Sequence, residues 1–570
     1  MGIAGRHRRF LLLFLVGLVW MEKISLLIFI FPPCMVKAIR RIMTFPKRDV
    51  QSLLNITIED ASQGLDAGRF TSVELVQAYL ARIEEAAEFK AVLQVNPEAV
   101  ITAQHLDEER ARSGRRGPLH GIPILVKDNI VTKDELDASA GSYALLGAKP
   151  SSESSLVARL RQAGVVILGK TNLSEWANFR GLAISPGWSP RGGQTLGAYY
   201  PNSSPEGSSS GSAVATALGL CTAALGTETV GSILDPAEVN NVVGYKPTRG
   251  LIATDGAIPI SKRQDVIGTL TRTVKDAAYM LSSMAGRSDL DDRTWNIPFE
   301  KIPDFTDFCD TDLAGIRIGI PRNAFPDDVP APIMTSFKYA QKILEMAGAK
   351  IVDNANFTAA KEFQKLNQQV KGIVRSSEFK KDIVKYLETL KTNPNEIHSA
   401  EDIINFTKTF PLEDYPGKDI GKFMWTQEEG IDVDSERYKA MVEQELYYGG
   451  EGGILGAMNK HKLDVLIIPS LLGITNDLAA KMGFPAMSIP LGSWPEGTPI
   501  KYDSRKPGLI RIAPGIPYCL TIISSAFSDG KILQVAYAFE KLAAVRIKRP
   551  LPFNVPKTEL GDIRKVVRKS

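Results

Sequence analysis

The chain of 570 residues is 44% hydrophobic and 23% charged. These values are typical of a globular protein and exclude a disordered or collagen-like chain. Its four cysteines are too few and too scattered for a disulfide framework. The sequence also lacks a CxxC pair and an HExxH motif, so we expect no metal site and no zinc hydrolysis.

The formal net charge of +4 is concentrated at the amino terminus. Residues 1–42 hold seven Lys and Arg against one Glu, a net charge of +6, which leaves −2 for the rest of the chain. A nucleic-acid-binding domain carries its basic residues as a patch on the folded part. The distribution therefore argues against a nucleic-acid partner.

Residues 1–42 read as a hydrophobic, basic leader. Residues 10–31 are mostly apolar, interrupted by Glu22 and Lys23, and 22 residues can cross a bilayer of about 30 Å. The basic start is also typical of a signal peptide, although no A-x-A-type cleavage site follows. Three interpretations stay open: a signal peptide, a membrane anchor that gives membrane association through residues 10–31, or an extension of the gene model. The first two predict a secretory or membrane-associated protein and the third a cytoplasmic one.

Five N-x-[ST] sequons lie after this leader and fit a secretory glycoprotein. They are at Asn55, Asn172, Asn202, Asn356 and Asn405.

The first part of the chain alternates between helix and strand. Thr71 and Glu74 are spaced as a capping box, and the apolar spacing that follows predicts a helix over 72–87. An apolar run predicts a strand at 121–126. A further helix at 154–163 leads into a strand at 165–168. This alternation predicts an α/β fold with helices on the faces of a sheet.

The rest of the chain continues this pattern around a helical insertion. A helix of small residues at 213–220 precedes a strand at 221–225 and a tight turn at 226–232. Charge-rich helical sequence fills 330–450 and is expected to form a peripheral cap. The α/β pattern then returns with strands at 463–469 and 484–491 and a helix at 532–542. Residues 551–570 are predicted to be a solvated basic tail.

Three features could carry chemistry. Lys127 follows a buried strand, where low dielectric would lower its pKa and make it a usable base. A serine-rich turn at 207–212 precedes a helix, and a second serine, Ser232, follows Gly231 in the 229–232 turn. Each feature also has a plain structural interpretation: a lysine extending to solvent from a strand end, a serine-rich helix cap and an ordinary turn.

A Ser–His–Asp triad is the rival arrangement. His120 is the only histidine near these motifs, and a lone loop histidine is more often structural than catalytic. We therefore expect His120 to be structural and the base to be lysine.

Together the segments 121–129 (GIPILVKDN), 207–212 (GSSSGS) and 226–247 (GTETVGSILDPAEVNNVVGYKP) resemble the amidase signature family in order and spacing. Ser208 and Ser232 are 24 residues apart, as are that family's two serines. The similarity is strong over residues 50–290 and looser over 460–545. Details such as RGGQ at 191–194 are similar to fungal members.

The resemblance implies a Ser–cis-Ser–Lys triad. Ser232 would be the nucleophile, Ser208 would bridge it to the base Lys127, and the Gly207–Ser208 peptide would be cis. Ser209 would support this network by hydrogen bonding. The backbone N–H groups of an oxyanion hole would come from Thr229, Val230, Gly231 and Ser232.

The resemblance also implies the fold and the reaction. The fold would be an α/β/α sandwich around a central mixed, mostly parallel multi-stranded sheet, forming one catalytic domain over 50–550. The activity would be hydrolysis of the C–N bond of a small-molecule amide through an acyl-enzyme, giving an acid and ammonia or an amine, without a cofactor. The oligomeric state stays open.

The sequence departs from the family's usual pattern at several positions near the two serines: Glu206, Ser210, Glu228, Val230 and Leu234. Val230 is the most unfavourable, because a β-branched residue resists a positive φ in the oxyanion turn. Two alternatives therefore remain: a catalytically impaired member of the family, and an amidotransferase A-like subunit that supplies ammonia in a tRNA-charging complex.

Overall fold

The computed structural model describes residues 52–471, 473–504, 508–548 and 551–567. The chain divides into Met1–Gln51 and Ser52–Ser570, and the described helices and strands belong to the second unit. The predicted leader, including residues 10–31, lies outside the described residues. Within the described ranges, no helix is both long enough and apolar enough to span a membrane.

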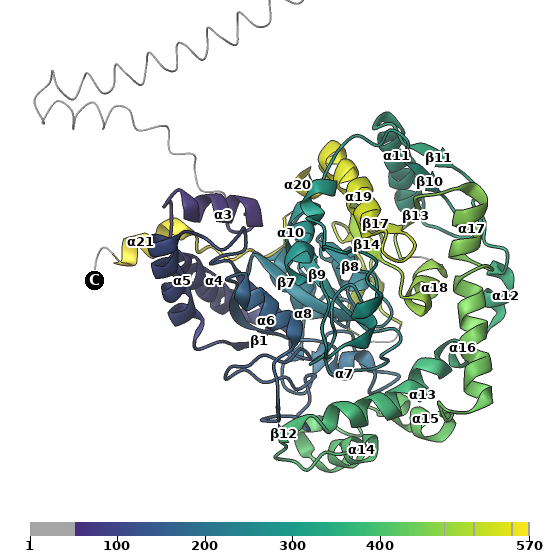
Figure 1. Ribbon diagram of the computed structural model, residues 1–570, viewed down its shortest axis with the longest axis horizontal. Coiled ribbons are helices and arrows are strands. Elements are labelled where there is room, and N and C mark those ends of the chain that lie inside the picture. Colours follow the sequence, from purple (N-terminus) through teal and green to yellow (C-terminus); the bar gives the residue numbers. More distant parts are fainter. Residues whose placement is uncertain (1–51, 472, 505–507, 549–550, 568–570) are drawn as a thin grey trace, which may run out of the picture. The chain divides into compact units, whose positions relative to one another are not determined.

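The second unit is built around an eleven-stranded sheet with the order β1-β4-β2-β7-β9-β8-β14-β17-β13-β10-β11 (Figure 1). Its strands, in chain order, are β1 Val92–Val95, β2 Pro123–Lys127, β4 Val166–Thr171, β7 Ala223–Glu228, β8 Val243–Lys246, β9 Val266–Thr271, β10 Arg317–Gly319, β11 Lys350–Val352, β13 Val465–Pro469, β14 Ala486–Ser493 and β17 Pro517–Ile523. Three two-stranded sheets pair β3 Lys149–Pro150 with β12 Leu390–Thr392, β5 Trp188–Ser189 with β6 Gly193–Gln194, and β15 Lys501–Tyr502 with β16 Ile510–Ile512.

The large sheet is mixed, as expected, and the α/β fold class is confirmed. The parallel pairs are β4–β2, β2–β7, β13–β10 and β10–β11, and the other six pairs are antiparallel. The expectation of a mostly parallel sheet therefore does not describe its pairings. A parallel pair needs a long crossover connection, usually a helix, whereas β8 is joined to β9 by a loop without an α-helix and pairs with it antiparallel.

Helices pack on the sheet in two groups. In one, α19 contacts both α10 and α11, and these helices contact β9, β13, β14 and β17. In the other, α8 and α9 contact each other, and α8 lies against β2, β4 and β7. The helices are α3 Ile58–Asp66, α4 Ser72–Glu85, α5 Ala99–Ser113, α6 Ser155–Gln162, α7 Glu175–Asn178, α8 Ser210–Ala217, α9 Leu234–Val239, α10 Val274–Met284, α11 Ala331–Met346, α12 Ala360–Lys365, α13 Gln368–Leu387, α14 Ala400–Thr409, α15 Gly421–Glu429, α16 Glu436–Gly449, α17 Ile454–His461, α18 Thr475–Met482, α19 Asp529–Ala543, α20 Val545–Lys548 and α21 Leu560–Val567.

Most locally predicted elements are present with shifts of a few residues. The capping box is formed, with Thr71 accepting from the backbone of Glu74, and α4 follows it. The predicted strands at 121–126 and 165–168 are β2 and β4, and the helix at 154–163 is α6. The strand predicted at 221–225 extends to Glu228, so the turn that holds Ser232 begins at residue 229 rather than 226.

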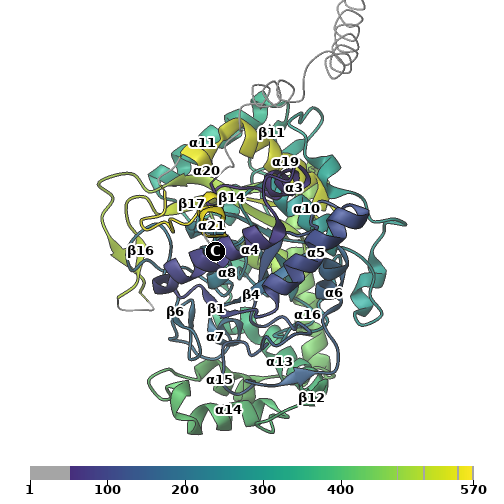
Figure 2. The ribbon, with the colours of Figure 1, turned by 90° about the vertical axis from the view of Figure 1, so that its left-hand side faces the viewer.

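The predicted cap at 330–450 begins later than expected, because α11 packs on the sheet and β11 is its edge strand. We define the cap as α12 to α16. Its helices α13, α14 and α15 lie together next to α7 in two perpendicular views (Figures 1 and 2). A second hydrophobic core joins α7 and the residue after it to the cap. The ring of Phe179 lies 4.6 Å from that of Phe379, and Trp176 packs edge-on against Phe423. These aromatic contacts attach the cap to α7 and to Phe179.

The carboxyl-terminal segment is packed rather than solvated over its described residues 551–567. The buried guanidinium of Arg82 donates to the carbonyls of Pro556 and Thr558 at 3.0 and 2.9 Å, and the ring of Phe553 lies 5.2 Å from that of Phe89. Arg564 forms an ion pair with Glu74 at 3.0 Å. Arg564, one of the basic residues that suggested a solvated tail, therefore attaches this segment to α4.

Candidate active site

Lys127 is the last residue of β2, a central strand whose five residues are all buried. The apolar run before it places its backbone in the core, and its side chain is fully buried. Its Nζ lies 2.8 Å from Oγ of Ser208, 3.0 Å from Oγ of Ser209 and 2.9 Å from Oγ1 of Thr227. It also donates to the carbonyl of Thr227 at 3.2 Å. The lysine therefore ends in a cluster of hydroxyl groups, and the interpretation of a lysine extending to solvent is wrong.

Burial lowers the pKa of Lys127 to about 7. The charges of Glu228 and Asp265 oppose this shift, but desolvation of the ammonium outweighs them. A substantial fraction of Lys127 is therefore neutral at pH 7, with a lone pair that can accept a proton from Ser208.

The serine turn at 207–212, which precedes α8, is hydrogen-bonded to the turn at 229–232, and we call these two segments the catalytic turns. The Gly207–Ser208 peptide is cis, as the resemblance implied. The backbone N–H of Ser209 donates to the carbonyl of Ser232 at 2.9 Å, and Oγ of Ser209 donates to the carbonyl of Thr227 at 3.1 Å. Ser209 therefore supports the network, in agreement with its expected role.

Ser232 lies in the turn between β7 and α9. Its side chain lines a cavity, and the residue is 7% exposed, so its hydroxyl sits at the boundary between core and solvent. Among the hydrogen bonds of the described residues, none uses the backbone N–H of Thr229, Val230, Gly231 or Ser232. Four successive N–H groups with no acceptor in the described part of the chain, next to a hydroxyl, are what an oxyanion hole requires.

The concern about Val230 is resolved by the backbone of this turn. The positive φ falls on Gly231, at +78°, and Val230 is not among the residues in the left-handed region. A Cβ at Gly231 would lie 2.4 Å from Oδ2 of Asp235, so glycine is needed there for space as well as conformation. Val230 adopts a conformation that a β-branched residue tolerates.

Glu228 fixes the far side of the same turn. Its Oε2 accepts from the backbone N–H groups of Ile233 at 2.8 Å and Leu234 at 3.1 Å. Leu234 is fully buried in the main hydrophobic core. The glutamate thus holds the start of α9 through backbone groups, and the leucine contributes packing.

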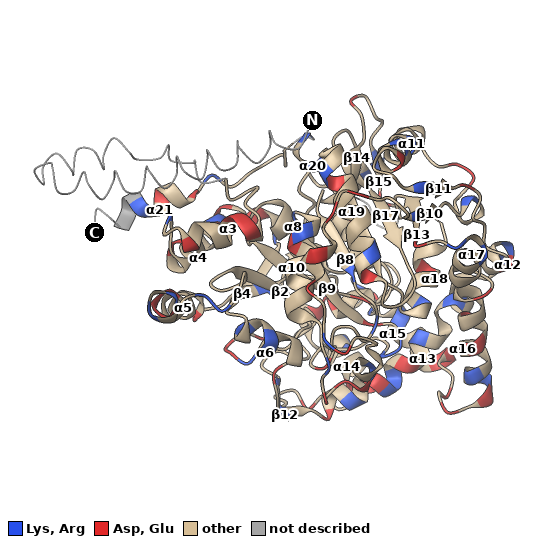
Figure 3. Cartoon of the chain, turned by 45° about the horizontal axis from the view of Figure 1, so that its top comes forward, with Lys and Arg blue, Asp and Glu red and all other residues tan. Residues whose placement is uncertain are grey.

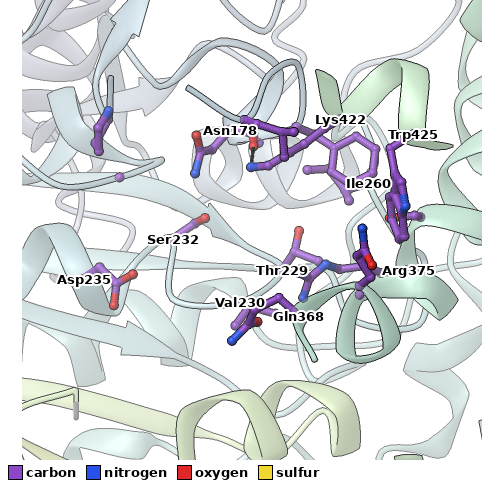
Figure 4. A pocket seen from close by; sticks show the side chains of 18 of the residues that line it. Asn178, Thr229, Val230, Ser232, Asp235, Ile260, Gln368, Arg375, Lys422 and Trp425 are labelled. Carbon is purple, nitrogen blue, oxygen red and sulfur yellow. Dashed lines mark hydrogen bonds between the residues drawn. The ribbon is translucent and has the colours of Figure 1, made fainter. Parts of the chain in front are cut away.

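The cavity beside Ser232 has a volume of about 290 Å³ and lies between the two catalytic turns and the cap (Figure 4). The catalytic side contributes Glu206, Gly207, Thr229, Val230, Ser232 and Asp235. The cap contributes Gln368, Gln369, Gly372, Arg375, Ser376, Lys422 and Trp425, and apolar side chains such as Phe179 and Ile260 complete the lining.

The structure thus joins Lys127, Ser208 and Ser209 by hydrogen bonds and places Ser232 beside them. The hydrogen bonds of the described residues include none between the hydroxyls of Ser208 and Ser232, although the backbones of the two turns are bonded. His120 is remote from this chemistry: it is fully buried, its Nε2 lies 2.9 Å from the carbonyl of Leu106, and its Nδ1 accepts from the backbone of Arg116 at 3.3 Å. It is therefore structural, as expected.

Sequence reasoning missed two groups that support the site. Thr227 offers both its hydroxyl and its carbonyl to Lys127, and its hydroxyl also accepts from Asn129 at 3.0 Å. Asp265 accepts from the hydroxyl of Thr229 at 2.5 Å and from the backbone of Ile260 at 2.7 Å. Thr227 stands in the GTETVGS segment and could have been noticed there. Asp265 is 36 residues from Thr229 and carries no local signal.

The sequence profile of the amidase family matches residues 74–533. The chain belongs to the amidase family. It is 39% identical over 539 residues to a protein of Arthroderma benhamiae named as an amidase, covering 90% of each chain. A similarly named protein of Schizosaccharomyces pombe is 35% identical, with 87% of each chain covered. The expected similarity to fungal members is confirmed, and the chain is a hydrolase that acts on amides.

Solved structures agree with this assignment. The native peptide amidase from Stenotrophomonas maltophilia superposes on the enzyme with a TM-score of 0.77 and 35% identity, covering 87% of this chain and 98% of the other. The A-type subunits of glutamyl-tRNA(Gln) amidotransferase match more weakly: that of Methylocella silvestris is 36% identical over 53% of this chain, and that of Prochlorococcus marinus is 29% identical over 87% of it. The comparisons therefore favour an amidase over the amidotransferase alternative.

Proposed function

We propose that the enzyme hydrolyses small-molecule amides through an acyl-enzyme on Ser232, with Ser208 as the proton relay and Lys127 as the base. One observation carries this assignment: a buried lysine with a pKa of about 7 lies 2.8 Å from Ser208, next to the cavity that Ser232 lines. A base with a pKa near the working pH gives the best balance of availability and proton affinity.

In the first half of the reaction, neutral Lys127 takes a proton from Ser208 while Ser208 takes the proton of Ser232. Oγ of Ser232 bonds to the carbonyl carbon of the amide, and the resulting oxyanion accepts hydrogen bonds from the 229–232 turn. The C–N bond then breaks, and the proton held by Lys127 passes back through Ser208 to the departing nitrogen. Ammonia or an amine leaves, and the acyl group stays on Ser232 as an ester.

In the second half, water replaces the amine. Lys127 draws a proton from the water through the same relay, the hydroxyl attacks the ester, and the carboxylic acid is released as Ser232 regains its proton. No step needs a cofactor. The cavity of about 290 Å³ accommodates a small amide or the end of a longer one. The similarity to a peptide amidase supports including peptide amides among the substrates tested.

A fluorophosphonate probe tests the nucleophile directly. We expect one covalent adduct on Ser232, found by mass spectrometry of the digested protein, and loss of amide hydrolysis in parallel. Ser232→Ala should remove the adduct, whereas Ser376→Ala, which removes a hydroxyl from the cap side of the same cavity, should keep it. An adduct that persists in Ser232→Ala would assign the nucleophile to another residue.

We also propose that the leader directs the enzyme into the secretory route. Four of the five sequon asparagines are exposed, which supports glycosylation: Asn55, Asn202, Asn356 and Asn405. Asn172 is fully buried, and its side chain is hydrogen-bonded to Ser189 and Thr195, so it cannot accept a glycan.

Mass measurement of the mature protein before and after glycosidase treatment tests the secretory proposal: secretion predicts glycans at exposed sites and a cleaved leader. A retained segment 10–31 would indicate an anchor, and an unmodified chain that starts after residue 20 would indicate a cytoplasmic protein.

A further inference from the structure

Arg375 is a cation in the wall of the cavity beside Ser232. It projects from α13 of the cap, and four charged residues in all line the cavity: Glu206, Asp235, Arg375 and Lys422. Two of them have charged or polar partners: Oε1 of Glu206 lies 3.6 Å from Nη1 of Arg511, and Nζ of Lys422 donates to the carbonyl of Asn178. Arg375 has neither an ion pair nor a side-chain hydrogen bond with any other residue that the structure describes.

The surroundings of Arg375 leave its guanidinium accessible from the cavity. Gly372, one turn earlier on α13, also lines the cavity, and a Cβ there would lie 3.3 Å from Nη2 of Arg375. Because Gly372 has no side chain, it neither hydrogen-bonds to the guanidinium nor shields it from the cavity. A partly desolvated guanidinium gains most from a carboxylate, which it can bind with two parallel hydrogen bonds.

Asp235 and Arg375 occupy different sides of the cavity. Asp235 lies beside Ser232, whereas Arg375 lies on the other side with Trp425 of α15 (Figure 4). Burial and then the neighbouring Glu206 and Glu228 raise the pKa of Asp235 well above its ordinary value, so this side of the cavity already disfavours a carboxylate. The apolar side chains of Phe179, Val230 and Ile260 also line the space. A fitting substrate therefore has an amide at Ser232, an apolar spacer and an anionic group on the cap side.

We propose that Arg375 makes the enzyme selective for amides that carry a carboxylate separated from the scissile bond by an apolar spacer. This proposal rests on the proposed function, because it assumes that the amide is cleaved at Ser232. The carboxylate could belong to the acyl part of the substrate, as in the monoamide of a linear dicarboxylic acid. It could equally belong to the amine part, as in an N-acyl amino acid. Arg375 would recognise the same group in both.

The test compares matched substrates on the purified full chain. Monoamides of linear dicarboxylic acids with four to eight carbons are compared with unbranched primary amides of equal length, and N-acetyl ω-amino acids with the corresponding N-acetyl alkylamines. Release of ammonia or amine gives kcat/KM for each. In one of the two series we expect the carboxylate substrate to exceed its neutral partner by about 10- to 100-fold, which is the range of a charged hydrogen bond. The series that shows the preference identifies the part of the substrate that reaches Arg375.

Variants assign the preference to Arg375. Arg375→Gln should remove the 10- to 100-fold preference, because kcat/KM for the carboxylate amide falls towards that of its neutral partner. Arg375→Glu should shift the preference towards ω-amino amides of the same length. Lys381→Gln is the matched control, because it removes one positive charge from the same helix at a residue paired with Asp434 outside this cavity, and it should keep the preference.

The outcomes separate the two proposals. If the wild type has the same kcat/KM for neutral amides as for carboxylate amides in both series, the proposed role of Arg375 is wrong and the proposed function is unaffected. A preference that survives in Arg375→Gln would also overturn it. Failure to cleave any amide, together with no probe adduct on Ser232, would instead overturn the proposed function. The wild-type comparison needs no substitution, so a poorly folded variant does not prevent a result.

Discussion

The catalytic turns and the cap differ in how tightly their residues are packed. Every residue of the adjacent strands β2, β4 and β7 is buried, and β2 ends at Lys127 while β7 leads into the 229–232 turn. In the cap, α16 buries three of its fourteen residues, and charges of both signs run along α13 and α16 (Figure 3). The two regions meet at the cavity beside Ser232.

This contrast assigns different tasks to the two regions. The proton relay needs hydroxyl groups held within hydrogen-bond reach of Lys127, and a close-packed sheet provides that precision. The cap supplies surfaces that can change without disturbing the relay. Substitutions in the catalytic turns should therefore reduce kcat, whereas substitutions in the cap should change KM and the choice of substrate.

The largest effect is expected from Lys127→Met, which keeps the side-chain volume and removes the base. We expect kcat to fall by about 10³- to 10⁴-fold, the upper range for loss of a general base. Steady-state kinetics with a neutral primary amide measure it, and an unchanged melting temperature shows that the fold is intact. More than a tenth of the wild-type kcat at pH 8 would mean that Lys127 is not the base.

A smaller loss, about 10²- to 10³-fold in kcat, is expected from Gly231→Ala. The methyl group would meet Asp235, and alanine resists the φ of +78°, so the N–H groups of the oxyanion turn should be displaced. Gly497→Ala is a matched control, since Gly497 has a φ of +81° and nothing within 4 Å of its added Cβ. If both variants keep full activity, the 229–232 turn does not hold the oxyanion.

The pH dependence of kcat/KM is expected to follow the protonation of Lys127. Well below the pKa of this lysine, kcat/KM should change tenfold for each pH unit. Only neutral Lys127 can accept a proton, and its pKa is about 7, so kcat/KM should fall as the pH drops below 7 and level off above it. Asp265 has a pKa raised by burial to about 6 and can add a second step at lower pH. Thr227→Val removes an acceptor from the charged lysine and should move the upper step to lower pH. If the fall in kcat/KM near pH 7 occurs at the same pH in Thr227→Val as in the wild type, a group other than Lys127 causes it.

Trp425→Ala probes the cap side of the comparison. We expect KM for apolar amides to rise by about tenfold, since the indole contributes apolar contact to the cavity, while kcat changes less than threefold. Trp295→Ala removes an exposed indole that does not line this cavity and should alter neither constant. A fall in kcat without a rise in KM would contradict the division of tasks between core and cap.

The smallest effect is expected from Val230→Gly, within about threefold in kcat, because Val230 needs no glycine-like conformation. Val230→Pro removes the N–H at the same position and should cost about 100-fold if that group holds the oxyanion. A large gain of activity in Val230→Gly would instead show that the valine impairs the enzyme.

Local patterns predicted many of the elements, because each was specified by residues within one or two turns. The capping box of α4 and the apolar runs of β2 and β4 needed no information from elsewhere. The order of the eleven strands could not be predicted in this way, since most neighbours are distant in sequence. The antiparallel majority follows from connections that local patterns do not reveal.

The sequence by itself determined the family and predicted the chemistry: three segments in the order and spacing of the amidase family hold Lys127, Ser208 and Ser232, and the resemblance implied their roles. Only the tertiary structure decided how that chemistry is set up. Burial lowers the pKa of Lys127, Thr227 and Asp265 support the two turns, and the positive φ falls on Gly231 rather than Val230. It also brought Arg375 from the cap to the cavity, some 140 residues along the chain from Ser232. These features depend on desolvation and on contacts between distant segments, and neither can be read from neighbouring residues.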